Sequence, residues 1–414
     1  MKKLGLARIW LPRYAYTKGF DIEERVCAVK TAFVNGKLYA ENRIVRIGSL
    51  IVDEEGRIEA ANESAHVPDG ATVLNLEGMT LLPGLIDVHV HGGGGYGMMD
   101  GDYESLNGMS RFHAAHGTTS FLATTDSDSD ESILRALRNC AAPAARRLDG
   151  AELLGVHLEG PFLNAARAGA QNKSHLRAPD VDALRRYLEA SGNGIRLATL
   201  APELDGGMEA TAMLAQAGVA VSIGHSDATY AEALEAVRRG ASQTTHHFNG
   251  MSPLHHREPG VAGAGLLCPS LTTELICDGI HVHPAVVKLL FDVKGAMNVC
   301  MITDAVAPAG LPDGDYGEIA MKDGQIWLKD GSSLAGSSLT MLQALKNAMD
   351  FTGYPLEKLL PSFTEVPARQ IGVSDRKGTL AAGKDADFLI VDEQLTLHAT
   401  YVRGREVYRR ATSA

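Results

Sequence analysis

Long apolar segments are missing from this sequence. No uninterrupted apolar run approaches the ~20 residues that a membrane-spanning helix needs. Near the N-terminus, Arg8, Arg13 and Lys18 break up the apolar residues, so we expect no signal peptide. Hydrophobic residues make up 45% of the chain, which indicates a globular protein with a large core.

Basic residues are in deficit. Lys and Arg number 39 against 50 Asp and Glu, which leaves a net charge of -11. A surface this acidic argues against nucleic acid or an anionic membrane as a partner. It does not exclude a small anionic substrate, because one pocket can be locally basic.

Cysteine and several catalytic signatures are scarce as well. Five scattered cysteines form no CxxC pair, and their odd number is typical of reduced thiols in a cytoplasmic protein. The sequence has no Gly-x-Ser-x-Gly elbow, no P-loop and no GxGxxG at a strand–helix junction. These absences weaken the interpretations as a serine hydrolase, a nucleoside-triphosphatase or a dinucleotide-dependent dehydrogenase.

The middle of the chain repeats one pattern eight times. Apolar runs rich in β-branched residues alternate with helical patterns such as 131–147, 181–190 and 230–239, while 249–271 is rich in Gly and Pro and predicts a long loop. The alternation predicts a parallel sheet, and eight repeats predict a closed (β/α)8 TIM barrel. The predicted strands are 85–91, 118–125, 153–159, 196–201, 219–225, 243–248, 274–278 and 299–304.

Both ends of the chain carry shorter strand patterns. They lie at 31–39, 49–53, 71–76, 387–391 and 401–407. We therefore expect a small β-sandwich domain built from both termini, with the barrel inserted between them. The predicted division is an N-terminal extension of unknown structure at 1–30, the β-sandwich at 31–82 plus 380–414, and the catalytic barrel at 83–379.

Ionisable side chains fall at the ends of the predicted strands, where a (β/α)8 barrel has its active site. His89 and His91 end the first strand, and their spacing of two puts both imidazoles on one strand face. Two imidazoles on one face can bind one cation, although a pair of half-exposed histidines has the same spacing.

Four further strands end on candidate ligands or acid–base groups. Glu159, His225 and His246 end the third, fifth and sixth strands, and together they match the His2Glu composition of catalytic zinc sites. Asp304 ends the eighth strand and suits a general base facing an activated water, then a general acid. Each residue alone also fits a structural role, as a hydrogen-bonded carboxylate, a core histidine or an ion-paired aspartate.

Several segments occur in a fixed order between about residues 31 and 410. They are Pro83-Gly84-Leu85-Ile86-Asp87-Val88-His89-Val90-His91, His157-Leu158-Glu159-Gly160-Pro161-Phe162, Gly224-His225-Ser226, Thr245-His246-His247-Phe248-Asn249-Gly250-Met251, Arg257-Glu258-Pro259-Gly260, Asp278-Gly279-Ile280-His281, Thr303-Asp304-Ala305 and Leu334-Ala335-Gly336-Ser337-Ser338-Leu339-Thr340. The series resembles the N-acetylglucosamine-6-phosphate deacetylase family of the amidohydrolase superfamily. The resemblance implies a barrel enzyme that removes the acetyl group from an amino-sugar phosphate.

The resemblance also implies roles for individual residues. Glu159, His225 and His246 would bind a divalent cation, with Zn2+ favoured over Fe2+, Mn2+ and Co2+, and Asp304 would be the catalytic acid and base. No lysine ends the third or fourth strand, so Glu159 would replace the carbamylated lysine of other amidohydrolases. The residues implied to contact the substrate are Ala170, Gln171, Asn249, Gly250, Arg257, Asp278, Gly279, Ile280, His281, Ser333, Leu334 and Ala335.

The implied phosphate site combines two subunits. His281 and Arg257 would hold the phosphate, with Arg257 reaching across from the partner subunit of a homodimer, and an arginine and a histidine suit an anionic group on chemical grounds as well. Some relatives replace the two histidines of the first strand by Gln and Asn and bind one metal. Because this chain keeps His89 and His91, we predict a second ion shared through Glu159.

One position departs from part of the family, and other functions stay open. Gln171 stands where some relatives carry histidine, and its amide can donate a hydrogen bond but cannot titrate. An N-acetylgalactosamine-6-phosphate deacetylase would share the whole set. A D-aminoacylase or dihydroorotase would share the metal ligands, but Arg257 and 278–281 argue against it. A non-catalytic barrel would be expected to have lost ligands, and here every ligand position is filled.

Overall fold

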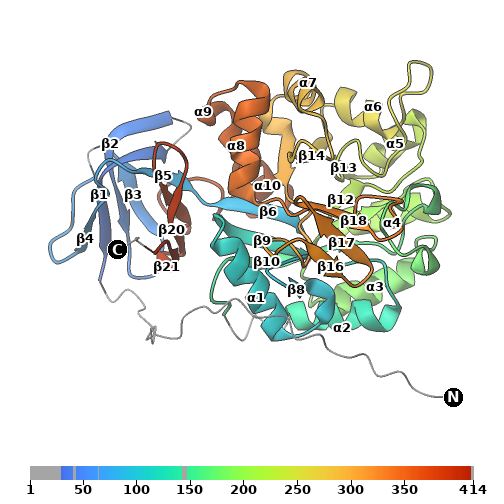
Figure 1. Ribbon diagram of the computed structural model, residues 1–414, viewed down its shortest axis with the longest axis horizontal. Coiled ribbons are helices and arrows are strands. Elements are labelled where there is room, and N and C mark those ends of the chain that lie inside the picture. The colour runs from blue at the N-terminus through green and yellow to red at the C-terminus, as the bar shows by residue number, and fades with distance from the viewer. Residues whose placement is uncertain (1–28, 41–42, 64, 142–146, 412–414) are drawn as a thin grey trace.

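The computed structural model describes residues 29–40, 43–63, 65–141 and 147–411. All but the last two residues of the predicted extension at 1–30 lie outside the described residues. Figure 1 shows two parts: a body of β-strands at one end of the molecule and a larger body in which helices surround a central sheet. Among the described residues, no helix combines the length and the apolar composition needed to cross a membrane.

The central sheet is the predicted barrel. Eight parallel strands follow one another around it, in the order β6–β9–β10–β11–β12–β13–β14–β15. The ring closes where the backbone N–H of His91 donates to Ala305 O and that of Asp304 donates to His89 O, at 2.9 and 3.0 Å. The (β/α)8 fold is therefore confirmed. The strands are β6 (Leu85–Val90), β9 (Thr118–Thr124), β10 (Glu152–Glu159), β11 (Ile195–Leu200), β12 (Ala220–Ile223), β13 (Ala241–Thr244), β14 (Thr272–Ile276) and β15 (Val299–Ile302).

Helices cover the outside of the barrel and make its strands apolar on both faces. Strands β6, β9 and β15 are buried at every position, which explains their continuous apolar and β-branched runs. The helices are α1 (Tyr103–Ala114), α2 (Asp130–Ala141), α3 (Val181–Ala190), α4 (Gly207–Gln216), α5 (Tyr230–Arg238), α6 (Gly260–Leu267), α7 (Pro284–Lys294), α8 (Met341–Thr352), α9 (Leu356–Leu359) and α10 (Glu365–Gln370).

Helix α6 lies inside the segment 249–271, so the prediction of a continuous loop there was wrong. Its sequence GVAGAGLL is apolar on almost all sides and shows no amphipathic period. The small residues are needed for packing, because a Cβ on Gly265 would lie 2.2 Å from the ring of His247.

Strands from both ends of the chain form one mixed sheet, in the order β21–β20–β19–β5–β1–β2–β3 with β4 paired to β1. Phe33, Phe388 and Tyr401 meet with ring centroids 4.6 to 5.1 Å apart although they come from different strands, because the sheet curls around an apolar core. The prediction of a single strand at 401–407 was wrong, since Arg403 and Gly404 turn the chain with φ of 50° and 70°. The strands are β1 (Thr31–Ala40), β2 (Arg43–Val52), β3 (Ile58–Asn62), β4 (Thr72–Asn75), β5 (Thr80–Pro83), β19 (Phe388–Val391), β20 (Leu397–Val402) and β21 (Arg405–Arg409).

A small antiparallel sheet between β15 and α8 was not predicted. Its strands are β16 (Gly314–Tyr316), β17 (Ile319–Lys322) and β18 (Gln325–Leu328). The sheet lies beside the barrel strands in Figure 1, and β17 and β18 contribute residues to the cavity at the carboxyl ends of those strands. A two-stranded ribbon, β7 (Gly92–Gly93) with β8 (Tyr96–Gly97), lies directly after β6.

Candidate metal centre and substrate cavity

Three of the predicted site residues follow their strands in a left-handed backbone conformation. His225, His246 and Asp304 each lie two residues beyond a barrel strand, with φ of 45°, 28° and 53°. This conformation costs of order 1–3 kcal/mol for a residue other than glycine and persists only where the surrounding structure holds it. The sharp turns bring the three side chains together over the mouth of the barrel.

Glu159, at the end of β10, lies at the centre of the cluster. Its Oε1 atom is 3.3 Å from His246 Nε2 and 3.5 Å from His225 Nε2, and these two Nε2 atoms are 3.0 Å apart. Within the part of the chain that the structure describes, Oε1 is buried without a hydrogen-bond donor. A buried carboxylate oxygen facing two imidazole nitrogens fits one cation between the three side chains.

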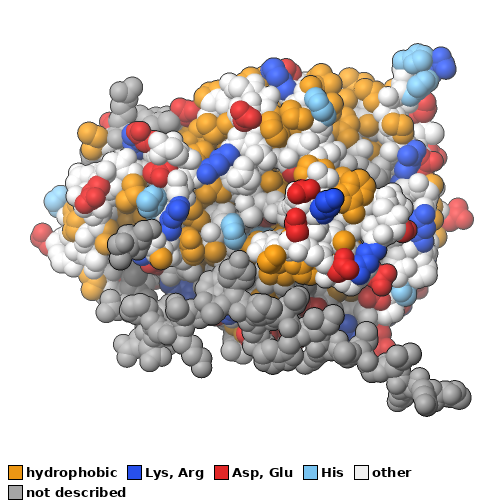
Figure 2. Space-filling model, in the orientation of Figure 1, with side chains coloured by type: hydrophobic (Ala, Val, Ile, Leu, Met, Phe, Trp, Pro, Cys, Tyr) orange, Lys and Arg blue, Asp and Glu red, His pale blue; other side chains and the backbone are white. Residues whose placement is uncertain are grey.

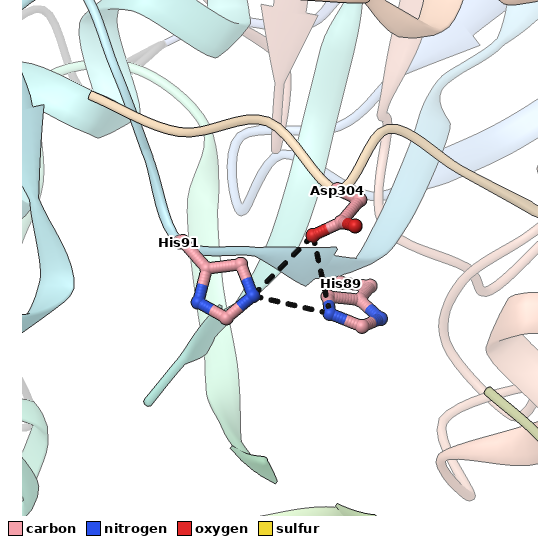
Figure 3. A group of neighbouring side chains, drawn as sticks. All are labelled: His89, His91 and Asp304. Carbon is pink, nitrogen blue, oxygen red and sulfur yellow. Dashed lines mark hydrogen bonds and ion pairs between the residues drawn. The ribbon is translucent and has the colours of Figure 1, made fainter. Parts of the chain in front are cut away.

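A second group of side chains adjoins the first. Figure 3 shows His89 and His91 turned toward Asp304, whose Oδ1 atom lies 3.4 and 3.3 Å from their Nε2 atoms. The same Nε2 atoms lie 3.5 and 3.2 Å from the carboxylate of Glu159. Glu159 thus contacts both histidine pairs, as the predicted sharing of Glu159 requires. The structure adds Asp304 to the group predicted for the second ion.

The other ring nitrogen of each histidine has an acceptor behind it. His225 Nδ1 lies 2.8 Å from a backbone carbonyl of the chain and His246 Nδ1 lies 3.1 Å from another. His89 Nδ1 lies 3.0 Å from Glu274, and His91 Nδ1 lies 2.7 Å from Asp126. A proton held on Nδ1 leaves a lone pair on Nε2, which is the form of histidine that binds metal.

Paired Nε2 lone pairs repel one another unless positive charge lies between them. The Nε2 atoms of His225 and His246 are 3.0 Å apart, and those of His89 and His91 are 3.3 Å apart. Each pair also faces a carboxylate. The donor set therefore fits a divalent cation at each pair, with nitrogen and oxygen ligands suited to zinc.

The electrostatics of the cluster favour positive charge. Burial lowers the pKa of His89, but the neighbouring carboxylates raise it more, and the net pKa lies well above its ordinary value. Burial raises the pKa of Asp304, but the imidazoles of His89 and His91 lower it further, so that the carboxylate stays ionised. A site that holds carboxylates ionised in a buried place is one that stabilises a cation.

Gln171 lies beside Glu159 in a fixed orientation. Its Oε1 atom accepts a hydrogen bond from the backbone N–H of Ser127 at 2.8 Å, so its amide nitrogen faces the centre and donates to Glu159 Oε2 at 2.9 Å. The residue is therefore a neutral donor, with its NH2 group turned to the metal-binding cluster.

A cavity of about 670 Å³ opens above the cluster. It is large enough for a phosphorylated monosaccharide, since ligand pockets range from roughly 300 to 1,000 Å³. The predicted substrate residues that line this cavity are Ala170, Gln171, Asn249, Gly250, His281, Ser333, Leu334 and Ala335. Their roles in binding stay predictions.

His281 reaches this cavity with the help of Asp278. Asp278 accepts the backbone N–H groups of Ile280 and His281 on one oxygen, at 2.8 Å each, and lies 2.6 Å from His281 Nδ1 with the other. Burial lowers the pKa of His281, but Asp278 raises it more, and the net shift is upward. Asp278, Gly279 and Ile280 are not among the lining residues of this cavity, and Asp278 instead holds a lining histidine that is suited to an anion.

Arg257 does not reach the cavity of its own chain. It lies on the exposed loop between β13 and α6, which projects from the molecule in Figure 1, and Figure 2 shows histidine and basic side chains at that tip. Glu258 anchors the loop, because its Oε1 atom accepts the backbone N–H of Tyr230 at 2.7 Å. The exposure of Arg257 suits the predicted reach of its side chain into a partner subunit, and that reach stays a prediction.

Sequence reasoning missed several residues of the site. Asp126 and Glu274 contact the Nδ1 atoms of His91 and His89. Glu274 gave no signal because it lies within a predicted strand. Asp126 directly follows the predicted second strand, and the rule that strand ends carry the chemistry would have found it. The lining residues from the unpredicted sheet are Ile319, Trp327 and Leu328, with Glu318 just before β17.

A parallel barrel with a carboxylate and paired histidines at its carboxyl end defines a metal-dependent hydrolase of the amidohydrolase class. A family model described as "Amidohydrolase family" matches residues 80–407 of the chain.

Comparison with individual proteins narrows the class. The N-acetylglucosamine-6-phosphate deacetylase of Lysinibacillus sphaericus is 42% identical over 356 residues, which cover 85% of this chain and 91% of that protein. The N-acetylgalactosamine-6-phosphate deacetylase of Escherichia coli O157:H7 is 35% identical over 356 residues, covering 85% and 94%. A mutant N-acetyl-D-glucosamine-6-phosphate deacetylase from Mycobacterium smegmatis, solved in complex with N-acetyl-D-glucosamine-6-phosphate, matches with a TM-score of 0.85 at 32% identity, covering 92% and 99%. The chain belongs to the N-acetylglucosamine-6-phosphate deacetylase family of amidohydrolases.

Proposed function

We propose that this protein hydrolyses the acetamide of N-acetyl-D-glucosamine 6-phosphate to D-glucosamine 6-phosphate and acetate. One observation carries the proposal: side chains from four barrel strand ends gather around Glu159 at the end of a fifth, in a chain 42% identical to a named deacetylase. Amide hydrolysis needs a polarised carbonyl, an activated water and a proton donor for the leaving amine. The cluster offers groups for each of these tasks.

The metal is a divalent cation, and its proposed identity is Zn2+. Glu159, His225 and His246 would hold one ion, and His89, His91 with the shared Glu159 and Asp304 would hold the other. When bound, the cation acts as a Lewis acid that polarises the acetamide carbonyl and lowers the pKa of water. The two histidine pairs, each of which faces the ionised carboxylate of Glu159 or Asp304, support this assignment.

Asp304 is the proposed acid and base of the reaction. Its carboxylate faces the same point as Glu159 and stays ionised in the free site, so it can accept the proton of the attacking water. It then returns this proton to the sugar nitrogen as the C–N bond breaks. Gln171 donates toward the same centre and would orient the acetyl group without changing its own protonation state.

The amino-sugar phosphate would lie along the cavity. Asn249 and Gly250 flank the metal cluster, and glycine suits position 250 because φ is 57° there and a Cβ would lie 3.1 Å from His225 Nδ1, closer than an ordinary contact. His281 would contact the phosphate. The loop at 333–335, which follows the β16–β18 sheet, would close over the sugar.

The proposed assembly is a homodimer in which Arg257 completes the phosphate site of the partner. The cavity has no Lys or Arg among its described lining residues, yet it carries five carboxylates, so an anionic substrate needs a cation from elsewhere. Arg257 is exposed on a projecting loop, and its guanidinium contacts only an imidazole in its own chain among the interactions described. We also assign the protein to the cytoplasm, which the free thiols of the described cysteines support.

The direct test is release of acetate from N-acetylglucosamine 6-phosphate by the purified protein, before and after chelation of metal. We expect turnover that chelation abolishes and Zn2+ restores. Unphosphorylated N-acetylglucosamine should be a much poorer substrate, and N-acetylgalactosamine 6-phosphate the weaker of the two epimers. Absence of acetate release from both phosphorylated sugars in metal-loaded protein would refute the proposed reaction.

A further inference from the structure

The two histidine pairs of the metal centre are held from behind in different ways. His225 and His246 contact neutral backbone carbonyls through Nδ1, whereas His89 and His91 contact the carboxylates of Glu274 and Asp126. A carboxylate makes an imidazole a stronger metal ligand than a carbonyl does, because it shares more of the Nδ1 proton and leaves more electron density on Nε2. His89 and His91 are therefore the pair whose metal binding is strengthened by neighbouring carboxylates.

Glu274 makes three contacts that join the two pairs. It lies on β14 and is 0% exposed. Its Oε2 atom lies 3.0 Å from His89 Nδ1 and accepts the backbone N–H of His246 at 3.0 Å, while Oε1 accepts the side-chain amide of Gln243 at 2.6 Å. One carboxylate thus orients the ring of His89 and also holds the strained backbone of His246, whose φ is 28°.

Asp126 is placed differently. It lies in the cavity lining, with its side chain 54% exposed, and its Oδ1 atom is 2.7 Å from His91 Nδ1. The Nδ1–H direction of His91 does not point along this contact, so the pair is an ion-pair contact rather than an aligned hydrogen bond.

We propose that Glu274 and Asp126 are positioning residues of the metal centre. They hold the protons of His89 and His91 on Nδ1, so that both Nε2 lone pairs face a second cation. Glu274 also accepts the backbone N–H of His246 and so links this site to the one formed by Glu159, His225 and His246. Neither residue needs to touch the substrate. The inference rests on the metal centre of the proposed function and not on the identity of the substrate.

Charge supports the same conclusion. Four carboxylates contact the four histidines of the cluster: Glu159, Asp304, Glu274 and Asp126. No Lys or Arg of the described residues forms an ion pair with any of the four. Buried carboxylates without cations are strongly disfavoured, and two divalent cations would balance the charge of the three buried carboxylates and the half-exposed Asp126. One divalent ion would balance only two of these four negative charges.

The test is a titration of the metal-free full-length protein with Co2+, followed by its visible absorption and by elemental analysis. We expect two ions per chain in the natural protein. Glu274→Gln and Asp126→Asn should bind the first ion normally and the second about 10- to 100-fold more weakly, which is the usual effect of losing such a partner. The expected loss is larger for Glu274→Gln, because Glu274 is buried and its replacement places an amide donor beside either Gln243 or His89.

Glu152→Gln is the matched control, because Glu152 is a half-buried carboxylate at the opposite end of β10 that touches no histidine in the ion pairs described. It should lower the thermal midpoint but bind both ions as the natural protein does. If Glu274→Gln fails to fold, Asp126→Asn still decides, since its site is half-exposed. Saturation of the natural protein at one ion would overturn the proposal, and so would unchanged binding of the second ion in either variant.

A second readout separates positioning from general stability. In protein with 15N-labelled histidine and bound Zn2+, the Nδ1-protonated form of His89 should be present in the natural protein and lost or broadened in Glu274→Gln. A variant that loses stability but keeps this signal would make Glu274 merely structural. Acetate release is not a readout here, so failure of the deacetylase assignment would leave this test unaffected.

Discussion

Strand β10 carries a cluster of carboxylates at each of its ends, and the two clusters are neutralised in opposite ways. At its first residue, Glu152 meets Asp385 and Asp387 around the ammonium of Lys377, with N–O distances of 2.6, 3.0 and 2.5 Å. Lys377 is buried, and although burial lowers its pKa, the carboxylates raise it more, so that it stays charged. This cluster contains its own cation.

At the last residue of β10, Glu159 contacts the four histidines, two of which also contact Asp304, and the described ion pairs of this cluster include no Lys or Arg. At both ends, ligand atoms lie close enough together to hold a metal ion. They come from three carboxylates, Glu152, Asp385 and Asp387, at the first end, and from two sets of two histidines and one carboxylate at the other. The comparison shows that converging carboxylates do not by themselves indicate a metal site. What distinguishes the two ends is a fixed positive charge: Lys377 supplies it at the first end, and none of the described Lys and Arg residues pairs with the carboxylates at the mouth of the barrel, where we propose a metal ion.

The largest expected effect comes from removing the internal cation. Lys377→Met should destabilise the protein by about 3–5 kcal/mol, because it leaves buried carboxylates uncompensated. Urea unfolding measures the loss, and metal content per chain should stay unchanged. If added Zn2+ or Mg2+ restored the stability, the carboxylates around Lys377 would also be able to hold a metal ion, and the distinction between the two ends of β10 would fail.

The next effect concerns catalysis at the cluster of Glu159, Asp304 and the histidines. Asp304→Asn should lower the turnover number at least ~100-fold, the low end for loss of a general acid–base group. The fold and the ion at Glu159, His225 and His246 should remain, as circular dichroism and elemental analysis would show. A variant with near-normal turnover would remove Asp304 from the mechanism.

Much of this fold was predictable because its signals are local. Most barrel strands are buried and rich in apolar or β-branched residues, and the predicted ligands lie at or just after the ends of such runs, so residue order alone placed Glu159, His225 and His246 at one rim. The Lys377 cluster has no such signal. It joins Lys377 to Glu152, 225 positions apart, and only the closed barrel brings them together.

The misses have separate physical causes. Helix α6 lacks an amphipathic period because it is buried on nearly all sides, and the three strands of the β16–β18 sheet have at most four residues each. Glu274 lies inside a strand where an apolar residue is expected, and its function depends on His89, which lies 185 positions away. Long-range pairs of this kind cannot be read from spacing along the chain.

Metal removal should give an effect of intermediate size. A cation that binds only the folded state adds about 2.7 kcal/mol of stability at a concentration 100 times its dissociation constant. Thermal unfolding with and without a chelator should show this loss equally in the natural protein and in Lys377→Met, because the two clusters share no partner and distant effects add. A chelator effect that changed in Lys377→Met would mean that the two ends of β10 are coupled.

The smallest expected effect tests whether the guanidinium of Arg257 from another subunit adds positive charge to the cavity above Glu159. Arg257→Ala should raise the Michaelis constant for N-acetylglucosamine 6-phosphate about 10- to 150-fold, since a charge-assisted contact contributes roughly 1.5–3 kcal/mol. Steady-state kinetics on the phosphorylated and unphosphorylated sugars should show the loss only for the former. Arg239→Ala, an exposed arginine paired with Glu235, is the matched control and should leave both unchanged.

The decisive arm mixes two inactive or weakened proteins. Arg257→Ala subunits retain Asp304, and Asp304→Asn subunits retain Arg257, so a mixed dimer contains one site with both groups only if Arg257 acts across the interface. After subunit exchange, activity at low substrate should rise above that of either variant alone. Each parent kept unmixed through the same exchange procedure is the control. Activity equal to the average of the parents would mean that Arg257 acts only within its own chain. The cavity above Glu159 would then receive no arginine from a partner subunit.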